Sequence, residues 1–599
     1  MIVIEKIPSV TGDVKAMRKT KIICTLGPST EDESILRELM LEGMDVARIN
    51  MSHGTYDEHR AKIEKVKKLR KELGLPTALL LDTKGPEIRT GNFEEPVVLE
   101  AGQDFNLSTV PCPGTKEGCS ITFAGLPDDV DVGTRILIDD GLIEMVVKSK
   151  TKTDILCKVI NGGPVSSHKG INVPDVTLSL DFLSEKDKED LRFGVEQDVD
   201  FVAASFTRCA EDINEMKAEL KKAGGEDIRI IAKIENKDGV NNIDEIVRVS
   251  DGIMVARGDL GVEIPIAEIP IIQKMLIHKT RNSDKPVITA TQMLDSMMKN
   301  PRPTRAETTD VANAIYDGTS VIMLSGETAA GKYPVEAVKT MAKIAETTEN
   351  NIDYISRFNK LDMHEKPDVT SAISHATCTT AHDLGASAII TVSKSGSTSR
   401  MLSKYRPECP IISGTPSEKV LRQTNMSWGV HPIMIEEKDN TDELINHVTS
   451  VAQEKGLLQN GDLVVLTAGV PLGVSGTTNL MKVHLVGNIL CSGGAIVNDL
   501  SAHGHLCVCK NDEEALSSCK EGEILVIKET NNSLLPIMKK CAGIITETDG
   551  TDSHAAIVGL ALNKPVIVGA VNATLILKNG ANVNIYAGKS VVTTATTKV

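Results

Sequence analysis

Eight short apolar runs recur along the amino-terminal part of the chain, and each ends in a cluster of charged, hydroxyl or amide residues. Helix-like sequence follows nearly all of them. The runs are KIICTLGPST from Lys21, MDVARINMSHG from Met44, TALLLDTKG from Thr77, VDFVAASF from Val199, IRIIAKIEN from Ile228, GIMVARGDLG from Gly252, PVITATQM from Pro286 and TSVIMLSGET from Thr319. Continuous apolar strands are typical of parallel sheets buried on both faces, and eight that alternate with helices predict a closed (β/α)₈ TIM barrel. In such a barrel the active site lies at the carboxyl ends of the strands, where this sequence places its polar residues.

One interruption divides the barrel pattern. After Pro86 the helical rhythm stops, and it resumes with SEKDKEDLRFGVEQ at Ser184; the sequence between is rich in Gly, Pro, Val and Thr. Because that composition predicts short strands and tight turns, we expect a barrel of residues 17–86 and 180–358 with a small inserted β-barrel domain at 87–179. An insert rooted at the active-site end of a barrel is well placed to act as a lid.

Two further regions follow the barrel. Strand and helix patterns alternate over residues 359–488 and predict a small open α/β domain, while Gly-, Val- and Ile-rich sequence over 489–599 predicts an additional compact domain. Residues 1–16 lack the basic leader and long apolar core of a signal peptide, so we expect a short extension, with Met1 or Met17 left open as the start. No apolar run is long enough to span a bilayer.

The bulk properties bear on partners and compartment. A net charge of −16 argues against a nucleic-acid or anionic-membrane binder, and aromatic residues, 3% of the chain, leave little for stacking bases. The twelve cysteines are scattered, with no CxxC pair and only Cys507 and Cys509 close together. We therefore expect free thiols in a reducing cytoplasm, and the spacing of His and Cys does not indicate zinc.

Chemically reactive residues gather where the predicted strands end. Lys233 and Glu235 are two apart on one strand, so their side chains point the same way, and Asp259 follows the next strand. Two carboxylates beside a lysine suit phosphoryl transfer, since the acids hold Mg²⁺ and the ammonium neutralises charge on a phosphate or an enolate. Thr291 adds a hydroxyl that can position a proton or a water. Further polar residues follow the second and third strands: Arg48, Asn50, Ser52, His53, Asp82, Thr83 and Lys84.

Ordinary salt bridges at the barrel rim are the alternative for any one of these residues, but they explain six strand ends together poorly. Longer motifs also stand in a fixed order between Met17 and Gly487: ARINMSHG, LLDTKGPEIRTG, HKGINVP, KIEN, MVARGDLGVEIP, ATQML, NPRPTRAE and MLSGETAAGKYP. In these motifs the chain resembles the pyruvate kinase family. The resemblance implies transfer of a phosphoryl group from phosphoenolpyruvate to ADP, giving pyruvate and ATP in glycolysis, by a cytoplasmic homotetramer.

Carried over residue by residue, the resemblance implies how substrate and metal are bound. The implied catalytic and substrate-binding residues are Arg48, Lys233, Gly258, Asp259 and Thr291. Glu235 and Asp259 would ligate a divalent metal, Mg²⁺ or Mn²⁺, and Lys233 would stabilise the transferring phosphoryl group and the enolate. We see no persuasive pairing of a nucleophile with a base, which favours direct transfer to ADP.

The resemblance also implies a monovalent cation and nucleotide contacts. Asn50, Ser52, Asp82 and Thr83 resemble the family's K⁺ site. Glu87 in KGPEIR is the variant expected to need K⁺, because a lysine there would supply the charge itself. The implied nucleotide contacts are Asn50, His53, Arg89 and Lys169. Since Lys169 lies in the predicted lid, closure would bring a cation to the ADP phosphates and help to exclude water.

A regulatory loop is implied in the α/β domain, where a strand runs into Ser393, Lys394, Ser395, Gly396, Ser397 and Thr398. Backbone N–H groups, hydroxyls and a helix start make such a turn a phosphate cradle, and the loop resembles the family's effector site. A plain serine-rich turn is the alternative. Fructose 1,6-bisphosphate, ribose 5-phosphate and AMP all stay open as the phosphorylated effector.

The last domain resembles the phosphohistidine domain of phosphoenolpyruvate-utilising enzymes, most clearly in TETDGTDSHAAIVGLALNKPVIVG. His554 is the candidate phosphohistidine. Asp552 stands where a threonine is usual, and Val558 and Gly559 replace residues that usually include an arginine. An acid beside the histidine repels phosphate, and the partner nucleotide-binding domain is absent, so a structural or regulatory appendage is favoured over a phosphocarrier.

Two other functions compete with the kinase reading. A metal-dependent lyase of the pyruvate-aldolase type would share the barrel, but the insert with Lys169 and the KGPEIR segment speak against it. A metabolite sensor built on an inactive kinase would have lost Lys233, Glu235, Asp259 or Thr291, and all four are present.

Overall fold

The structure is a computed structural model, and its description covers residues 17–360, 368–469, 478–487 and 489–595. These residues form two compact units. The first contains the described residues of Met1–Met363 and Lys394–Met434, and the second contains those of His364–Ser393 and Ile435–Val599. Among the helices described, none combines the length and the apolar character needed to cross a membrane.

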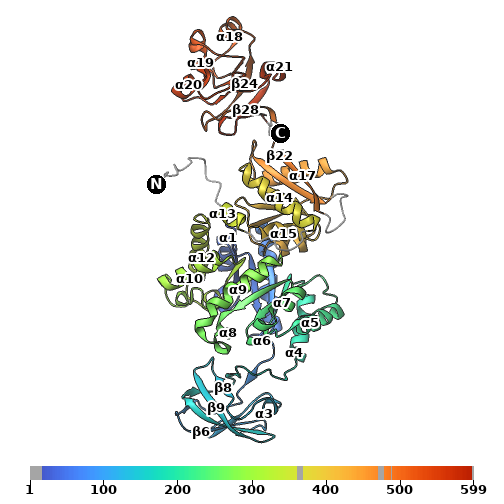
Figure 1. The fold of residues 1–599 in the computed structure, drawn as a ribbon, viewed down its shortest axis with the longest axis vertical. Helices are drawn as coiled ribbons and strands as arrows, with labels where there is room; N and C mark the ends of the chain where they lie inside the picture. Colours follow the sequence, from blue (N-terminus) through green and yellow to red (C-terminus); the bar gives the residue numbers. More distant parts are fainter. Residues whose placement is uncertain (1–16, 361–367, 470–477, 488, 596–599) are drawn as a thin grey trace. The chain divides into compact units, whose positions relative to one another are not determined.

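A closed barrel of parallel strands forms the centre of the first unit (Figure 1). The strands are β1 (Lys21–Thr25), β2 (Val46–Asn50), β3 (Ala78–Asp82), β13 (Phe201–Ala204), β14 (Arg229–Ile234), β15 (Gly252–Ala256), β16 (Val287–Ala290) and β17 (Val321–Leu324). Their order around the barrel, β1-β17-β16-β15-β14-β13-β3-β2, follows the chain once around. Each strand lies within one of the eight apolar runs, so the predicted (β/α)₈ barrel is confirmed.

Helices cover the outside of the barrel (Figure 1). They are α1 (Glu33–Glu42), α2 (Tyr56–Leu73), α4 (Glu185–Glu196), α5 (Ala210–Ala223), α6 (Lys237–Asn241), α7 (Ile243–Val249), α8 (Arg257–Glu263), α9 (Ile269–Asn282), α10 (Arg305–Asp317), α11 (Gly326–Ala329), α12 (Pro334–Glu349) and α13 (Tyr354–Asn359). Capping residues fix where several begin and end. Thr55 caps α2 and Thr304 caps α10, each with a glutamate that bonds back to the cap, and Gly74 ends α2 in the left-handed conformation.

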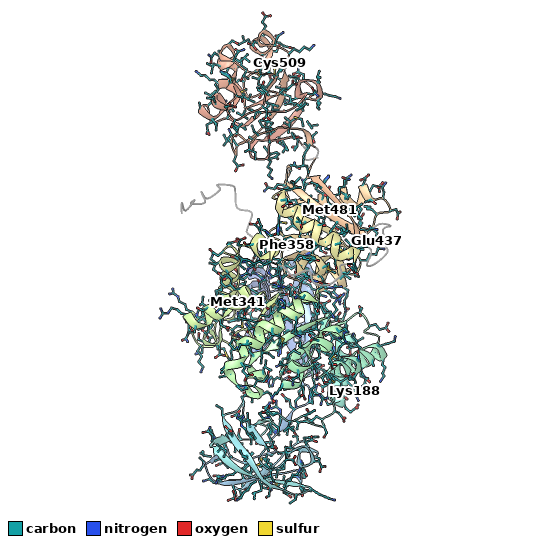
Figure 2. All side chains as sticks on the ribbon, in the orientation of Figure 1. Lys188, Met341, Phe358, Glu437, Met481 and Cys509 are labelled. Carbon is teal, nitrogen blue, oxygen red and sulfur yellow. The ribbon has the colours of Figure 1, made fainter. Side chains whose placement is uncertain are left out.

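Two apolar layers hold the barrel together. Inside it, alternate strand positions such as Ile23, Phe201 and Met254 fill the space between the strands. The opposite positions pack outward against the helices in a larger core that includes Leu79 on β3 and Met341 on α12 (Figure 2). Because the interior is packed with side chains, a ligand can bind only at the rim.

The insert between β3 and α4 is a small β domain with its own apolar core. It contains β4 (Ile88–Arg89), β5 (Val97–Leu99), β6 (Asp104–Ser108), β7 (Gly118–Ser120), α3 (Leu126–Asp129), β8 (Arg135–Ile138), β9 (Ile143–Lys150), β10 (Asp154–Asn161), β11 (Gly163–Val165) and β12 (Gly170–Asn172). Its main sheet has the order β4-β12-β8-β9-β10-β6-β7. A β-bridge between Thr90 and Ile121, next to the two edge strands, joins the edges as in the predicted small barrel.

The segment Lys394–Met434 closes the amino-terminal end of the barrel. Its elements are α15 (Ser397–Lys404), β19 (Ile411–Thr415), α16 (Glu418–Thr424) and β20 (Val430–Met434), and the two strands pair in parallel. Met426 is fully buried with the residues inside the barrel. Arg422 Nε donates a 2.7 Å hydrogen bond to Asp200, just before β13, and Lys21 Nζ bonds the Val430 carbonyl at 2.7 Å.

The second unit holds two sheets. In the first, β21 (Leu463–Gly469) pairs in parallel with β18 (Ala388–Val392) and antiparallel with β22 (Thr478–Leu485), accompanied by α14 (Val369–Asp383) and α17 (Thr441–Glu454). The second has the order β23-β29-β28-β24-β25-β26-β27. Its elements are β23 (Ile489–Ser492), β24 (Ser501–Val508), α18 (Asp512–Ser518), β25 (Ile524–Ile527), α19 (Leu535–Lys540), β26 (Gly543–Thr546), α20 (His554–Ala561), β27 (Val566–Ile567), α21 (Ala573–Ile576), β28 (Asn582–Tyr586) and β29 (Val591–Thr594).

Candidate active site

Charged side chains and a hydroxyl meet at the carboxyl ends of β3, β13 and β14. Lys233 Nζ lies 2.9 Å from Glu235 Oε1 and 3.2 Å from Asp82 Oδ1. It also donates a 2.8 Å hydrogen bond to the hydroxyl of Ser205, which follows β13. The spacing of two residues puts Lys233 and Glu235 on one side of the chain. One buried ammonium therefore sits between two carboxylates that come from different strands.

Asp82 links this lysine to Arg48 on the neighbouring strand β2. Arg48 donates from Nε to Asp82 Oδ2 at 2.6 Å and from NH1 to the Thr25 hydroxyl at 2.9 Å. Burial alone would raise the pKa of Asp82, but Arg48 and Lys233 outweigh it and the pKa is lowered. Asp82 therefore stays ionised and fixes both cations at the rim.

The carboxylates of Glu235 and Asp259 fit a divalent metal. Burial raises the pKa of Glu235 to about 7, with Lys233 opposing the shift and Asp259 adding to it. Burial also raises the pKa of Asp259, against the attraction of Lys233. Burial lowers the pKa of Lys233, but Asp82 and Glu235 outweigh it and the net shift is upward, so the lysine stays an ammonium. The raised pKa values of Glu235 and Asp259 show that neighbouring cations do not fully compensate their negative charge. Their carboxylate oxygens are the ligands that Mg²⁺ and Mn²⁺ prefer.

Gly258 and Asp259 lie in the first turn of α8, and Thr291 follows β16 beside them. The Gly258 N–H donates a 2.8 Å hydrogen bond to the Thr291 hydroxyl. Thr291 has a φ of 67°, in the left-handed region that is costly for a β-branched residue. Arg257 braces this turn, because it donates to the carbonyls of Ala290 at 3.2 Å and Thr291 at 2.8 Å.

The residues predicted for K⁺ lie at the ends of β2 and β3. Asn50 and Asp82 are paired in register, and the Ser52 N–H donates a 3.1 Å hydrogen bond to Asn50 Oδ1. Thr83 follows Asp82 directly, so amide, hydroxyl and carboxylate oxygens share one edge. This all-oxygen set suits a hard cation, and one of low charge, because Arg48 and Lys233 already balance Asp82.

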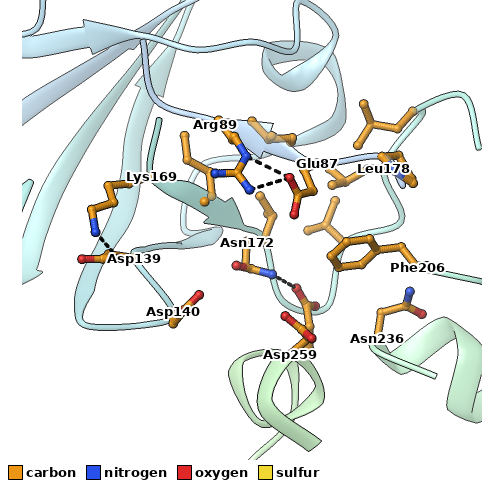
Figure 3. Close-up of a pocket in the computed structure, with 18 of the residues that line it drawn as sticks. Glu87, Arg89, Asp139, Asp140, Lys169, Asn172, Leu178, Phe206, Asn236 and Asp259 are labelled. Carbon is orange, nitrogen blue, oxygen red and sulfur yellow. Dashed lines mark hydrogen bonds and ion pairs between the residues drawn. The ribbon is translucent and has the colours of Figure 1, made fainter. Parts of the chain in front are cut away.

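A cavity of about 460 Å³ lies between the insert and the barrel rim (Figure 3). Lys169 and Arg89 line it from the insert, and Asp259 lines it from the barrel. Lys169 Nζ pairs with Asp139 at 2.8 Å, and Arg89 NH2 pairs with Glu87 at 2.7 Å. The volume is in the range of sites for small molecules. His53, also predicted as a nucleotide contact, is exposed and does not line this cavity.

Hydrogen bonds fasten the insert to the rim beside this cavity. Asn172 on β12 donates to Glu263 at the end of α8 at 2.9 Å (Figure 3), and Thr177 donates to Asp238 at 2.9 Å. The first bond joins the insert to α8, the short helix that carries Asp259, and the second joins it to α6. The position of the insert is therefore coupled to the position of a metal-ligand candidate.

Two further predicted sites, the effector loop and His554, are formed by segments of the chain that follow the barrel. In the predicted effector loop, Ser393 follows β18 and Gly396 caps α15 with a φ of 72°, while the Ser395 carbonyl accepts a 3.3 Å hydrogen bond from Arg229. His554 is the first residue of α20. Its Nδ1 lies 2.9 Å from the Thr530 hydroxyl, and its Nε2 lies 3.1 Å from Asn532 Oδ1.

Comparison with known proteins agrees with this architecture. The family model "Pyruvate kinase, barrel domain" matches residues 17–338, "Pyruvate kinase, alpha/beta domain" matches 371–484, and "PEP-utilising enzyme, mobile domain" matches 519–589. The pyruvate kinase of Sporosarcina psychrophila is 48% identical over 579 residues, 96% of this chain and 99% of that protein. That of Geobacillus stearothermophilus is 48% identical over 574 residues, 95% of this chain and 98% of that protein. This chain belongs to the pyruvate kinase family. Like other pyruvate kinases it is a phosphotransferase that acts on phosphoenolpyruvate and ADP.

Several residues at the pyruvate kinase site were not predicted. Ser205 carried a signal, because it ends an apolar run as the predicted residues do, and Arg257 stands inside a quoted motif. Asn172 and Glu263 also stand inside quoted motifs, but no pattern indicated that they meet, and Asp139 carried no signal. Their contacts arise from folding of the insert and its docking on the rim, which no local pattern specifies.

Proposed function

We propose that this pyruvate kinase transfers the phosphoryl group directly, with Lys233 as the cation that stabilises it. The observation that carries the proposal is the contact of Lys233 with Asp82 and Glu235, within 3.2 Å of both, at the strand ends. Arg48 pairs with the same carboxylate of Asp82 as Lys233 does, and we propose that it binds the phosphate. Preorganised positive charge in a buried site lowers the barrier to transfer without a covalent intermediate.

The proposed step forms one phosphorus–oxygen bond as another breaks. A terminal oxygen of ADP attacks phosphorus while the bond from phosphorus to the enol oxygen breaks, and the bonding pair stays on that oxygen. The resulting enolate takes a proton at carbon and becomes pyruvate. Lys233 faces the developing negative charge, and the Thr291 hydroxyl, held by the Gly258 N–H, orients the proton donor.

Members of this family use metal ions in catalysis in general. We assign a Mg²⁺ or Mn²⁺ ion to Glu235 and Asp259, where it would neutralise phosphate charge. We assign K⁺ to Asn50, Ser52, Asp82 and Thr83, with Glu87 marking a chain that needs it. Arg89 and Lys169 are the proposed contacts for the ADP phosphates, with Asn50 and His53 as further candidates from the sequence.

Regulation and assembly complete the proposal. A phosphorylated effector, a sugar phosphate or AMP, would bind at 393–398, and the enzyme would be a cytoplasmic homotetramer. We keep the predicted domains: the barrel at 17–86 and 180–358, the insert at 87–179, the α/β domain at 359–488 and the last domain at 489–599. Both ring nitrogens of His554 have hydrogen-bond partners, which supports an appendage rather than a phosphocarrier.

An omission experiment tests the assignment of cofactors. Pyruvate production from phosphoenolpyruvate is measured with ADP, Mg²⁺ and K⁺ left out one at a time, and each omission should abolish or sharply lower the rate. Replacing K⁺ by a large organic cation should have the same effect. Full activity in that buffer would contradict the K⁺ site and the argument from Glu87.

Substitution of the lysine tests the mechanism. In Lys233→Ala the turnover number should fall by about a thousandfold or more, because the ammonium that faces the developing negative charge would be lost. Lys188→Ala is the matched control, since that lysine forms an ion pair with Glu185 on α4 and belongs to none of the proposed sites (Figure 2). An unchanged turnover in Lys233→Ala would remove this lysine from the mechanism.

A further inference from the structure

The domain after β23 contains a cluster of thiols that phosphoryl transfer does not use. The sulfurs of Cys507 and Cys519 and a carboxylate oxygen of Glu523 all lie within 4.8 Å of one another. The sulfur of Cys509 lies 3.6 Å from that of Cys507. In the part of the chain that the structure describes, no other group of three or more His, Cys, Asp or Glu ligands gathers so closely.

The local fold brings these residues together from three consecutive segments. Cys507 lies on β24 and Cys509 just after it (Figure 2), so the spacing of two places both on one side of the strand. Cys519 is the C-cap of α18. Glu523 precedes β25, and its Oε2 accepts a 2.8 Å hydrogen bond from the Lys520 N–H, which orients the carboxylate. The spacing of the cysteines does not indicate zinc, because Cys519 and Glu523 approach the other two only when α18 packs on the sheet.

Ordinary core thiols are the alternative, since buried cysteine packs as a small apolar residue. Two features favour a site. Four of the twelve cysteines lie between Cys507 and Cys541, whereas the other eight are spread over the rest of the chain. A half-buried carboxylate also stands among the thiols, where a core of apolar character would exclude it. All twelve cysteines are free thiols in the structure.

We propose that Cys507, Cys509, Cys519 and Glu523 bind one soft or borderline divalent cation, of which Zn²⁺ is the probe. With metal–sulfur bonds of about 2.3 Å, sulfurs in a tetrahedral site are roughly 3.8 Å apart, close to the spacing of Cys507 and Cys509. The ligand atoms of Cys507, Cys519 and Glu523 are within 4.8 Å of one another, so these three need to move by only about 1 Å to close on an ion. Thiolate ligands select such metals over Mg²⁺, which separates this site from the carboxylates of the barrel.

Binding exchanges protons for the metal and needs no oxidant. Burial and the neighbouring Cys507 raise the pKa of Cys509 to about 12, so this thiol is protonated in the metal-free protein. Each thiol that coordinates releases one proton to solvent. The ion would tie β24, α18 and β25 together and stabilise this domain against unfolding.

Metal content of the full chain tests the proposal. Protein stripped with chelator and reductant is exposed to Zn²⁺, desalted and analysed by mass spectrometry. We expect one zinc per chain that the double variant C507S/C519S does not retain. Cd²⁺ should give the ultraviolet absorption of a cadmium–thiolate bond in the wild type and lose it in the double variant, which separates this site from zinc held by carboxylates.

Two further variants guard against misfolding. E523Q alters a half-buried side chain and leaves the thiols in place, and it should weaken zinc retention about tenfold. C491S is the matched control, because Cys491 is buried on the other face of the same sheet and should keep the zinc. Equal zinc and cadmium signals in the wild type and C507S/C519S would overturn the proposal. The proposal would also be overturned if the purified protein held no metal and only ten of its twelve thiols could be titrated. That result would indicate a redox pair instead.

Discussion

At the scale of single residues, Asp82 is the side chain on which the barrel rim depends. Its two oxygens bind Arg48 and Lys233, so one carboxylate positions both the proposed phosphate-binding cation and the proposed catalytic cation. Ser205 completes the set, since its hydroxyl is bonded to Lys233 and lies 3.2 Å from Asp82. The lysine is therefore held from three directions and approaches a substrate with its position already fixed.

Removing the Ser205 hydroxyl should loosen that position. In Ser205→Ala we expect the turnover number to fall about tenfold, equivalent to about 1.4 kcal/mol, with little change in the KM for ADP. Ser250→Ala is the control, because Ser250 is a buried serine near the amino-terminal end of β15 whose hydroxyl has no hydrogen-bond partner among the described residues. Steady-state kinetics of both variants test this prediction. If Ser205→Ala had the same turnover number as Ser250→Ala, the Ser205 hydroxyl would have no role in positioning Lys233.

Alternation along a strand was enough to predict that the side chains of Lys233 and Glu235 lie on the same side, because that relation is local. The strand ends also predicted Asp82 and Arg48 as members of the site. The sequence could not predict that Asp82 lies between Arg48 and Lys233, since this depends on β3 being flanked by β2 and β13 in the closed barrel. Nor could it predict Asn172 against Glu263, which requires the insert to dock.

At the scale of elements, the turn after β16 and the start of α8 form one supported unit. Two successive residues, Thr291 and Gln292, have positive φ, and such backbone persists only where the surroundings over-determine it. Arg257 supplies that support through two backbone carbonyls, and Asp310 on α10 holds its NH1 at 2.7 Å. Arg257 thus helps to place the Thr291 hydroxyl through its contacts with the backbone.

Arg257→Met should release this turn. We expect kcat/KM for phosphoenolpyruvate to fall by about ten- to a hundredfold, because Thr291 would no longer be held at its productive position. The drop should appear in the turnover number more than in the KM for ADP, because the proposed ADP contacts, Arg89 and Lys169, lie on the insert. Arg305→Met, an exposed arginine at the start of α10, is the matched control. A loss of stability with unchanged kinetics would contradict a positioning role.

At the scale of the whole molecule, the proposed catalytic residues all belong to the first compact unit, whereas the domain after β23 has its own sheet and apolar clusters in the second. Lys589 pairs with Asp462 at 2.7 Å within that second unit. The separation of cores explains why composition predicted an additional domain. It could not predict the thiol cluster, because that arises from how α18 packs.

A shortened chain tests the independence of the chemistry. A protein ending at Gly487 should keep its turnover number within about twofold, since a domain with a separate core is not needed to form the barrel rim. Coupled assays of pyruvate formation and thermal unfolding of the two proteins provide the measurement. A loss of more than tenfold in turnover, with the barrel still folded, would show that the last domain shapes the active site.

Met426 limits how this enzyme can be taken apart. Its side chain fills the amino-terminal end of the barrel, although it lies more than a hundred residues after the last barrel strand in the sequence. A fragment that ends after the final barrel helix would leave a cavity beneath the strands and would expose Asp200. A new enzyme built on this barrel must therefore include the segment Lys394–Met434 as well as the strands and helices of the barrel.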